Sequence, residues 1–201
     1  MPDLLAISWD PKVVAIADQS ISDASILAYL RAVGCARLDT IVNRLGRKSA
    51  SVSDSLEGLV SASVVIRESE RFLLHPAWRS ILPEVIAVET KVSNWRKAIV
   101  QASRNQLFSH RSFIALPESV ATLALRSGNI DRLGIGILSI ASDGTTSVLS
   151  DAAIRRPKIW AYYYQLAHHV AQNAPKSTLC HFSSLSTKRA LLSPNTRLSL
   201  D

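Results

Sequence analysis

The stretch Val85-Ile86-Ala87-Val88-Glu89-Thr90-Lys91 organises this 201-residue chain. An apolar run is followed by a carboxylate and an amine two positions apart. In a β-strand, residues i and i+2 point to the same face, so Glu89 and Lys91 would project together from the strand end. Burying either charge without a partner or a metal is costly. The stretch therefore predicts a strand that either reaches water at its end or serves a site there.

The residues after this strand predict a helix and then a second strand. Residues 94–108 have a helical pattern, and the stripe at i, i+3, i+4 and i+7 holds Ala98, Gln101, Ala102 and Asn105. Residues 112–116 are an apolar run that predicts the next strand. A strand, a helix and a strand in this order are typical of a parallel βαβ crossover. We therefore expect Glu89, Lys91 and Gln101 to converge at one edge of a sheet.

Glu89-Thr90-Lys91 resembles the (D/E)xK half of the PD-(D/E)xK nuclease superfamily, and Gln101 with its helix resembles the QxxxY element of the RecB-like branch. Asn105 stands where that element has tyrosine. Pro2-Asp3, followed by an apolar run, supplies the proline-aspartate form of the other half. The resemblance implies an α/β, restriction-endonuclease-like fold, in which helices flank a mixed sheet.

The resemblance also implies a metal-dependent hydrolase that cleaves phosphodiester bonds in DNA. Asp3 and Glu89, with the backbone carbonyl of Thr90, would bind Mg²⁺ or Mn²⁺ as oxygen ligands. Lys91 would position the attacking water or neutralise the phosphate, and Gln101 would orient Lys91 or the nucleophile. One alternative is a non-catalytic DNA-binding or regulatory protein with a nuclease-like core. Another is an interaction module that binds no nucleic acid.

The start of the chain predicts a hairpin. Two apolar, β-branched runs within residues 2–18 flank a turn that contains aspartate and proline. Asp18 ends the second run and competes with Asp3 for the acidic role, although either carboxylate can also cap a strand or helix end. We expect residues 1–20 to be the first hairpin of the nuclease-like core and residues 79–173 to be its remainder.

Residues 21–78 predict an inserted winged helix-turn-helix. Three helical patterns are followed by two alternating runs, 63–66 and 71–74, that suit the strands of a wing. The residues expected to contact bases and phosphates begin the third helix and are Arg47, Lys48, Ser49 and Ser51. Asp54 and Glu57 follow on the same helix, so a structural or dimerising role stays open beside DNA contact.

Residues 117–150 are expected to complete the α/β core, with a hairpin turn at Asp143-Gly144. Residues 157–172 predict a helix whose aromatic residues fall at i, i+3 and i+4 spacing. These are Trp160, Tyr163 and Tyr164. Core packing is the first interpretation of this spacing and base stacking is the second.

The formal net charge of +7 is concentrated at the end of the chain. Residues 152–201 hold seven Lys and Arg residues against one acid, Asp201. Such a segment fits a nucleic-acid partner, because neutralising phosphates releases counterions, and a solvated tail is the alternative. The predicted nucleic-acid contacts in it are Arg155, Arg156 and Lys158. Residues 174–201 are expected to be a basic, loosely ordered tail.

Composition bounds the remaining classes of protein. With 47% hydrophobic residues the chain can bury a sizeable core. No apolar run reaches the ~18 residues of a membrane span, so we expect a cytoplasmic protein without a membrane partner. Cys35 and Cys180 are too few for a disulfide framework or a zinc site. Serine and cysteine hydrolase motifs are missing from the sequence. A homodimer is compatible with all of these features.

Overall fold

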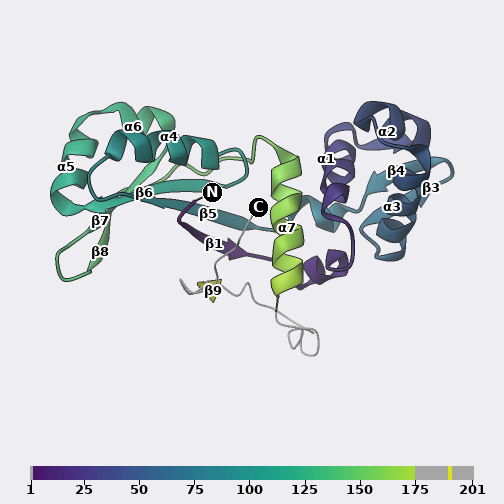
Figure 1. Ribbon diagram of the computed structural model, residues 1–201, viewed down its shortest axis with the longest axis horizontal. Helices are drawn as coiled ribbons and strands as arrows, with labels where there is room; N and C mark the ends of the chain where they lie inside the picture. The colour runs from purple at the N-terminus through teal and green to yellow at the C-terminus, as the bar shows by residue number, and fades with distance from the viewer. Residues whose placement is uncertain (1, 175–189, 192–201) are drawn as a thin grey trace. The chain divides into compact units, whose positions relative to one another are not determined.

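The computed structural model describes residues 2–174 and 190–191, and the chain divides into two compact units (Figure 1). Unit 1 comprises Met1–Ser8, Glu84–Lys158 and Lys188–Asp201, and unit 2 comprises Trp9–Pro83 and Ile159–Thr187. Within the described part of the chain, no helix is both long enough and apolar enough to cross a membrane.

Unit 1 is α/β and is built on a mixed sheet. The sheet strands are β1 (Leu4–Ser8), β5 (Glu84–Thr90), β6 (Arg111–Pro117), β7 (Gly136–Ile140), β8 (Thr146–Ser150) and the short β9 (Ala190–Leu191). Their order in the sheet is β8-β7-β6-β5-β1-β9. The three central strands β5, β6 and β7 are parallel, whereas β1 is antiparallel to β5 and β8 is antiparallel to β7. The predicted α/β class and mixed sheet are therefore confirmed.

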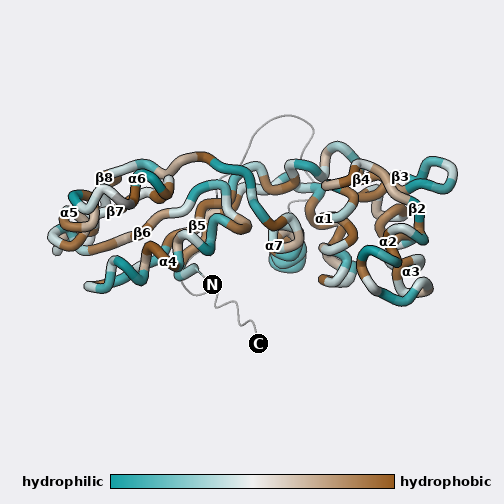
Figure 2. The backbone as a smooth tube through the Cα atoms, turned by 90° about the horizontal axis from the view of Figure 1, so that it is seen from above, coloured by the Kyte–Doolittle hydropathy of each residue, from teal (hydrophilic) through white to brown (hydrophobic). Residues whose placement is uncertain are grey.

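Three helices of unit 1 lie along one face of this sheet (Figure 1). They are α4 (Trp95–Asn105), α5 (Glu118–Arg126) and α6 (Asn129–Leu133). Alanines on the inner stripes of α4 and α5 let the helices approach the branched residues of β6 and β7. The core formed in this way includes Ala98, Ala102, Ala121, Ala124, Ile114, Leu116 and Ile137. Figure 2 shows the result as a hydrophobic path along β6 beside the more hydrophilic α4.

The predicted hairpin over residues 2–18 is wrong. Leu4–Ser8 is a strand, but Pro11–Ile16 is a short 3-10 helix, η1, which belongs to unit 2. Proline suits the first turn of a helix because its missing N–H group is not needed there. Asp10 caps η1, and its side chain accepts a hydrogen bond from the Lys12 N–H at 2.9 Å. Strand β1 pairs instead with β5, more than seventy residues further along the chain.

Residues 21–80 of unit 2 form three α-helices, two short 3-10 helices and a three-stranded antiparallel sheet. The helices are α1 (Ala24–Val33), α2 (Leu38–Leu45) and α3 (Ser49–Ser61), preceded by the short η2 (Ile21–Asp23). The strands β2 (Cys35–Arg37), β3 (Val65–Glu68) and β4 (Arg71–Leu74) lie in the order β2-β4-β3, and η3 (Pro76–Ser80) follows them. Gly46 ends α2 at a φ of 62°, in the left-handed region that glycine adopts without strain.

Helix α7 (Trp160–Asn173) belongs to unit 2, although residues 79–173 were expected to continue the core that contains β5. Its aromatic residues pack as the first interpretation predicted, since Tyr163 is 1% exposed and Tyr164 is fully buried. The Tyr163 hydroxyl accepts a hydrogen bond from the Leu82 N–H and donates one to the Leu82 carbonyl. Burial raises the pKa of both tyrosines, so their hydroxyl groups stay neutral.

Candidate functional site

Strands β1 and β5 bring three charged side chains together at one end of the sheet in unit 1. Leu4 lies opposite Val88 in the antiparallel pair, so the start of β1 meets the end of β5. Asp3 directly precedes β1, and Lys91 directly follows β5. The Lys91 Nζ is 3.3 Å from Asp3 Oδ2 and 3.8 Å from Glu89 Oε2. The structure thus places Asp3, Glu89 and Lys91 side by side.

Asp3 is held by the end of the neighbouring strand. Its Oδ2 accepts hydrogen bonds from the Thr90 N–H at 2.7 Å, from the Thr90 hydroxyl at 3.0 Å and from Lys91 Nζ at 3.3 Å. Desolvation raises the pKa of this carboxyl, but the bonds from Thr90 and Lys91 outweigh it and leave the pKa below its usual value. Asp3 is therefore ionised at neutral pH.

Glu89 is a buried carboxylate with one oxygen left over. Its residue exposure is 1%, and its Oε1 accepts a hydrogen bond of 2.8 Å from the Asn105 side-chain amide. Its Oε2 has no hydrogen-bond partner among the described residues and meets only the Lys91 ammonium, at ion-pair distance. Leaving a buried charged oxygen without a hydrogen bond costs free energy. Such an oxygen is a candidate ligand for a cation.

The Lys91 ammonium lies among three oxygen atoms, those of Asp3, Glu89 and the Thr90 carbonyl. It donates a 2.8 Å hydrogen bond to the Thr90 carbonyl in addition to its contacts with the two carboxylates. These oxygens are the three ligands that the sequence predicted for a metal ion. Two carboxylates and a carbonyl oxygen suit Mg²⁺, which commonly takes one or two carboxylates and keeps several waters. The described residues contain no metal-binding group of three or more His, Cys, Asp or Glu side chains.

Asn105, rather than Gln101, forms a hydrogen bond with Glu89. Gln101 lies on α4 with its Oε1 buried, and that atom has no hydrogen-bond partner among the described residues. Asn105 follows one turn later, is 5% exposed and bonds Glu89. Sequence reasoning placed Asn105 on the inner stripe of this helix but gave it no function. Its position four residues after Gln101, on the same helix face, is the signal that identifies it.

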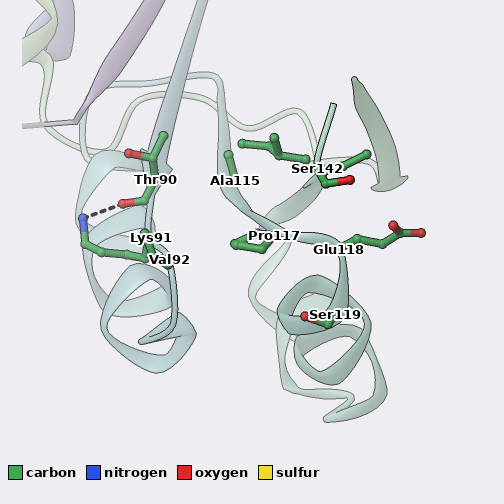
Figure 3. A pocket seen from close by; sticks show the side chains of 10 residues that line it. Thr90, Lys91, Val92, Ala115, Pro117, Glu118, Ser119 and Ser142 are labelled. Carbon is green, nitrogen blue, oxygen red and sulfur yellow. Dashed lines mark hydrogen bonds between the residues drawn. The ribbon is translucent and has the colours of Figure 1, made fainter. Parts of the chain in front are cut away.

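An open cleft of about 740 Å³ adjoins the carboxylate site, at the carboxyl ends of β5, β6 and β7. In open parallel sheets this is the end at which ligands bind. Thr90 and Lys91 belong to both the cleft and the carboxylate site. Glu118, Ser119 and Ser142 lie across the cleft from them, while the Lys91 side chain turns back to the Thr90 carbonyl (Figure 3).

The nucleic-acid contacts predicted in unit 2 fall into two groups. Lys48, Ser49 and Ser51 are exposed at the start of α3. Arg47 instead serves an internal network, because its guanidinium lies 3.6 Å from the buried Asp23 and bonds the Ser51 and Ser55 hydroxyls. The structure therefore gives Arg47 a structural role that the sequence did not predict.

The remaining predicted residues form no hydrogen bond or ion pair with Asp3, Glu89 or Lys91 within the described part of the chain. Arg155, Arg156 and Lys158 follow β8 in unit 1, with Arg156 and Lys158 exposed. Asp18 is exposed and belongs to unit 2, so Asp3 is the acid that joins Glu89 and Lys91. The basic tail predicted for residues 174–201 lies almost entirely outside the described residues.

Comparisons of the chain with protein-family models, with curated proteins and with solved structures found no match.

Proposed function

We propose that this protein is a metal-dependent nuclease that hydrolyses phosphodiester bonds, with DNA as the nucleic acid that its motifs favour. One observation carries the proposal. A single ammonium group, that of Lys91, contacts Asp3 and the Thr90 carbonyl and lies beside the unsatisfied oxygen of Glu89. Three oxygen atoms from two neighbouring strand ends therefore converge on one positive charge. This is the arrangement that the PD-(D/E)xK resemblance implies.

The roles of the side chains follow from these contacts. Asp3, Glu89 and the Thr90 carbonyl would hold Mg²⁺ or Mn²⁺, which lowers the pKa of a bound water and offsets the charge that develops on the phosphate. Lys91, released from the carboxylates, would orient the attacking water or neutralise the phosphate. Asn105 fixes one oxygen of Glu89 through its 2.8 Å hydrogen bond, so that the other oxygen faces the site.

The finer fold assignments belong to the same proposal. We assign unit 1 as a restriction-endonuclease-like core on the basis of its β5-α4-β6 crossover and the antiparallel β1. We assign α1, α2 and α3 with the β2-β4-β3 sheet as a winged helix-turn-helix. Three helices followed by a two-stranded hairpin in about fifty residues support this assignment. Exposed Lys48, Ser49 and Ser51 at the start of α3 would then contact nucleic acid.

A second candidate function is non-catalytic nucleic-acid binding. The observation that favours it is the completeness of the Lys91 contacts, because an internal cation on all three oxygens can replace a metal permanently. In that case the charged cluster only joins the ends of β1 and β5. The two candidates differ in whether a divalent ion displaces Lys91.

Titration calorimetry with Mg²⁺ and Mn²⁺, together with nicking of a supercoiled plasmid, tests the proposal. Glu89→Gln should lose ion binding and lower nicking by at least about 10³-fold, because a hard cation loses an oxygen ligand. Lys91→Ala should lose nicking but bind the ion at least as tightly as the unaltered protein, since the competing ammonium is gone.

Glu84→Gln is the matched control for these variants. Glu84 lies at the opposite end of the same strand, where it pairs with Arg111, and its replacement should leave nicking unchanged. An unaltered protein that neither binds either ion nor nicks DNA would refute the nuclease proposal and leave non-catalytic binding. Equal loss of nicking in Glu84→Gln and Glu89→Gln would show that the strand, and not the site, had been damaged.

A further inference from the structure

The outer face of α4 carries basic residues and no acidic residue. Arg96, Lys97 and Arg104 are exposed, and the eleven residues of this helix include no acid. Arg96, Val100 and Arg104 follow one another at i, i+4 and i+8, so they form a single stripe along the helix. At 1.5 Å per residue, the two arginines are about 12 Å apart along the helix axis.

None of these three cations forms an ion pair with an acid in the described part of the chain. The Arg96 guanidinium lies over the Trp95 ring, 4.6 Å from its centroid, which holds the side chain without neutralising it. By contrast, Arg111 is paired with Glu84 and Asp151, and Lys91 is paired with Asp3 and Glu89. The positive charge of the α4 face is therefore uncompensated.

The charge balance singles out unit 1 among the described residues. Its described part has ten Lys and Arg against seven Asp and Glu, a net charge of +3, whereas that of unit 2 has nine against eight, a net charge of +1. An ordinary solvated helix face mixes both signs, which favours solubility. A helix face with cations alone instead attracts a polyanion.

The two faces of α4 connect this charge to the carboxylate site. Its inner face packs Ala98 and Ala102 into the core and sends Asn105 to Glu89. Arg104 is the residue directly before Asn105, and Trp95 begins the helix four residues after Lys91. Arg104 on the outer face is therefore within about one helix diameter, ~10 Å, of Asn105 on the inner face.

We infer that the outer face of α4 binds the phosphate backbone of the nucleic-acid substrate and leads it to the Asp3, Glu89 and Lys91 site. The identity of the partner rests on the proposed function. Guanidinium groups bind phosphates in a bidentate manner, and the face offers no Asn or Gln side chain that would read base edges. Binding by α4 is thus independent of sequence and depends strongly on salt.

Fluorescence anisotropy with labelled 20-nucleotide single-stranded and 20-base-pair duplex DNA, measured in EDTA over a range of salt concentrations, tests this inference. Arg96→Gln/Arg104→Gln should reduce the slope of log affinity against log salt by about 1.8 for the duplex, at ~0.9 per lost phosphate contact. Arg126→Gln/Arg132→Gln removes two exposed arginines from α5 and α6 and is the matched control, with the slope expected to stay unchanged.

Equal slopes in the two double variants would overturn the inference, as would a failure of the unaltered protein to bind either probe. Lys97→Gln provides a second variant, with an expected slope change of about 0.9 for the duplex, and circular dichroism verifies folding in each case. Because EDTA prevents hydrolysis, binding through α4 without plasmid nicking in Mg²⁺ would refute the proposed function alone. If the unaltered protein nicks the plasmid but both α4 variants bind DNA as it does, only the proposed role of the α4 face is refuted.

Discussion

Glu89 in unit 1 and Asp23 in unit 2 are both buried carboxylates beside a basic residue, but their surroundings differ. Asp23, 3% exposed, accepts a 2.7 Å hydrogen bond from the Ser55 hydroxyl and pairs with Arg47. Arg47 itself has further hydrogen-bond partners in the Ser51 and Ser55 hydroxyls. Within the described part of the chain, Glu89 keeps one oxygen without a hydrogen bond, next to an ammonium that also contacts Asp3.

This difference in hydrogen bonding indicates a structural role for Asp23 and a candidate functional role for Glu89. An ion pair whose donors and acceptors are satisfied fixes two elements together, here η2, which holds Asp23, and α3 with the turn before it, which hold Ser55 and Arg47. An unsatisfied oxygen in a charged cluster costs stability and remains available to a ligand. Arg47 was predicted to contact nucleic acid from its charge, with a structural role left open, and its contacts with Asp23, Ser51 and Ser55 support the structural role.

Asn105→Ala should give the largest effect in this comparison. Glu89 would lose its remaining side-chain hydrogen bond, and supporting residues of this kind typically change activity or metal affinity by about 10- to 100-fold. Asn94→Ala is the matched control, because Asn94 caps the same helix through a hydrogen bond from the Lys97 N–H and does not touch Glu89. Plasmid nicking and thermal unfolding should be measured together. Equal loss of nicking in both variants would return Asn105 to a purely structural role.

Asp23→Ala should change stability and leave nicking intact. The Ser55 hydroxyl loses its acceptor and Arg47 its counter-charge, at an expected cost of about 1–3 kcal/mol in the free energy of unfolding. Urea titration of the full chain measures this cost. Asp54→Ala, an exposed acid on α3, should change the free energy by less than about 0.5 kcal/mol. Loss of nicking in a folded Asp23→Ala protein would contradict the division between the two carboxylates.

The smallest expected effect is the contribution of Asp3 to stability at low pH. Hydrogen bonds from Thr90 and Lys91 leave the folded-state pKa of Asp3 below its usual 3.8. This contribution to stability is therefore present above the unfolded-state pKa and is lost as pH falls through the folded-state value. The melting temperature of Asp3→Asn should therefore be lower than that of the unaltered protein at pH 7, and the gap should narrow as the pH falls below 3.8. The difference is modest because Asp3 is partly exposed. A constant difference over this range would contradict the assigned pKa.

The local patterns predicted several elements of the fold and part of the site. The alternation and apolar content of residues 85–91 and 112–116 predicted β5 and β6, and the stripe through Ala98 and Ala102 predicted α4. The hairpin over residues 2–18 was wrong because β-branched residues next to a proline suit either a strand or a short helix. In the folded chain β1 pairs with β5, and not with residues 13–17, and Pro11–Ile16 forms a 3-10 helix.

The sequence by itself determined the α/β class of unit 1, because its strand and helix patterns alternate along the chain. It also determined that Glu89 and Lys91 lie on the same side, because side-chain direction in a strand has a period of two. Only the tertiary structure decided that Asp3, rather than Asp18, joins them, because β1 pairs with a strand distant in sequence. Tertiary packing also decided that Asn105 reaches Glu89 and that α7 belongs to unit 2. Contacts between residues far apart in the chain depend on which surfaces bury each other, and no local pattern records that choice.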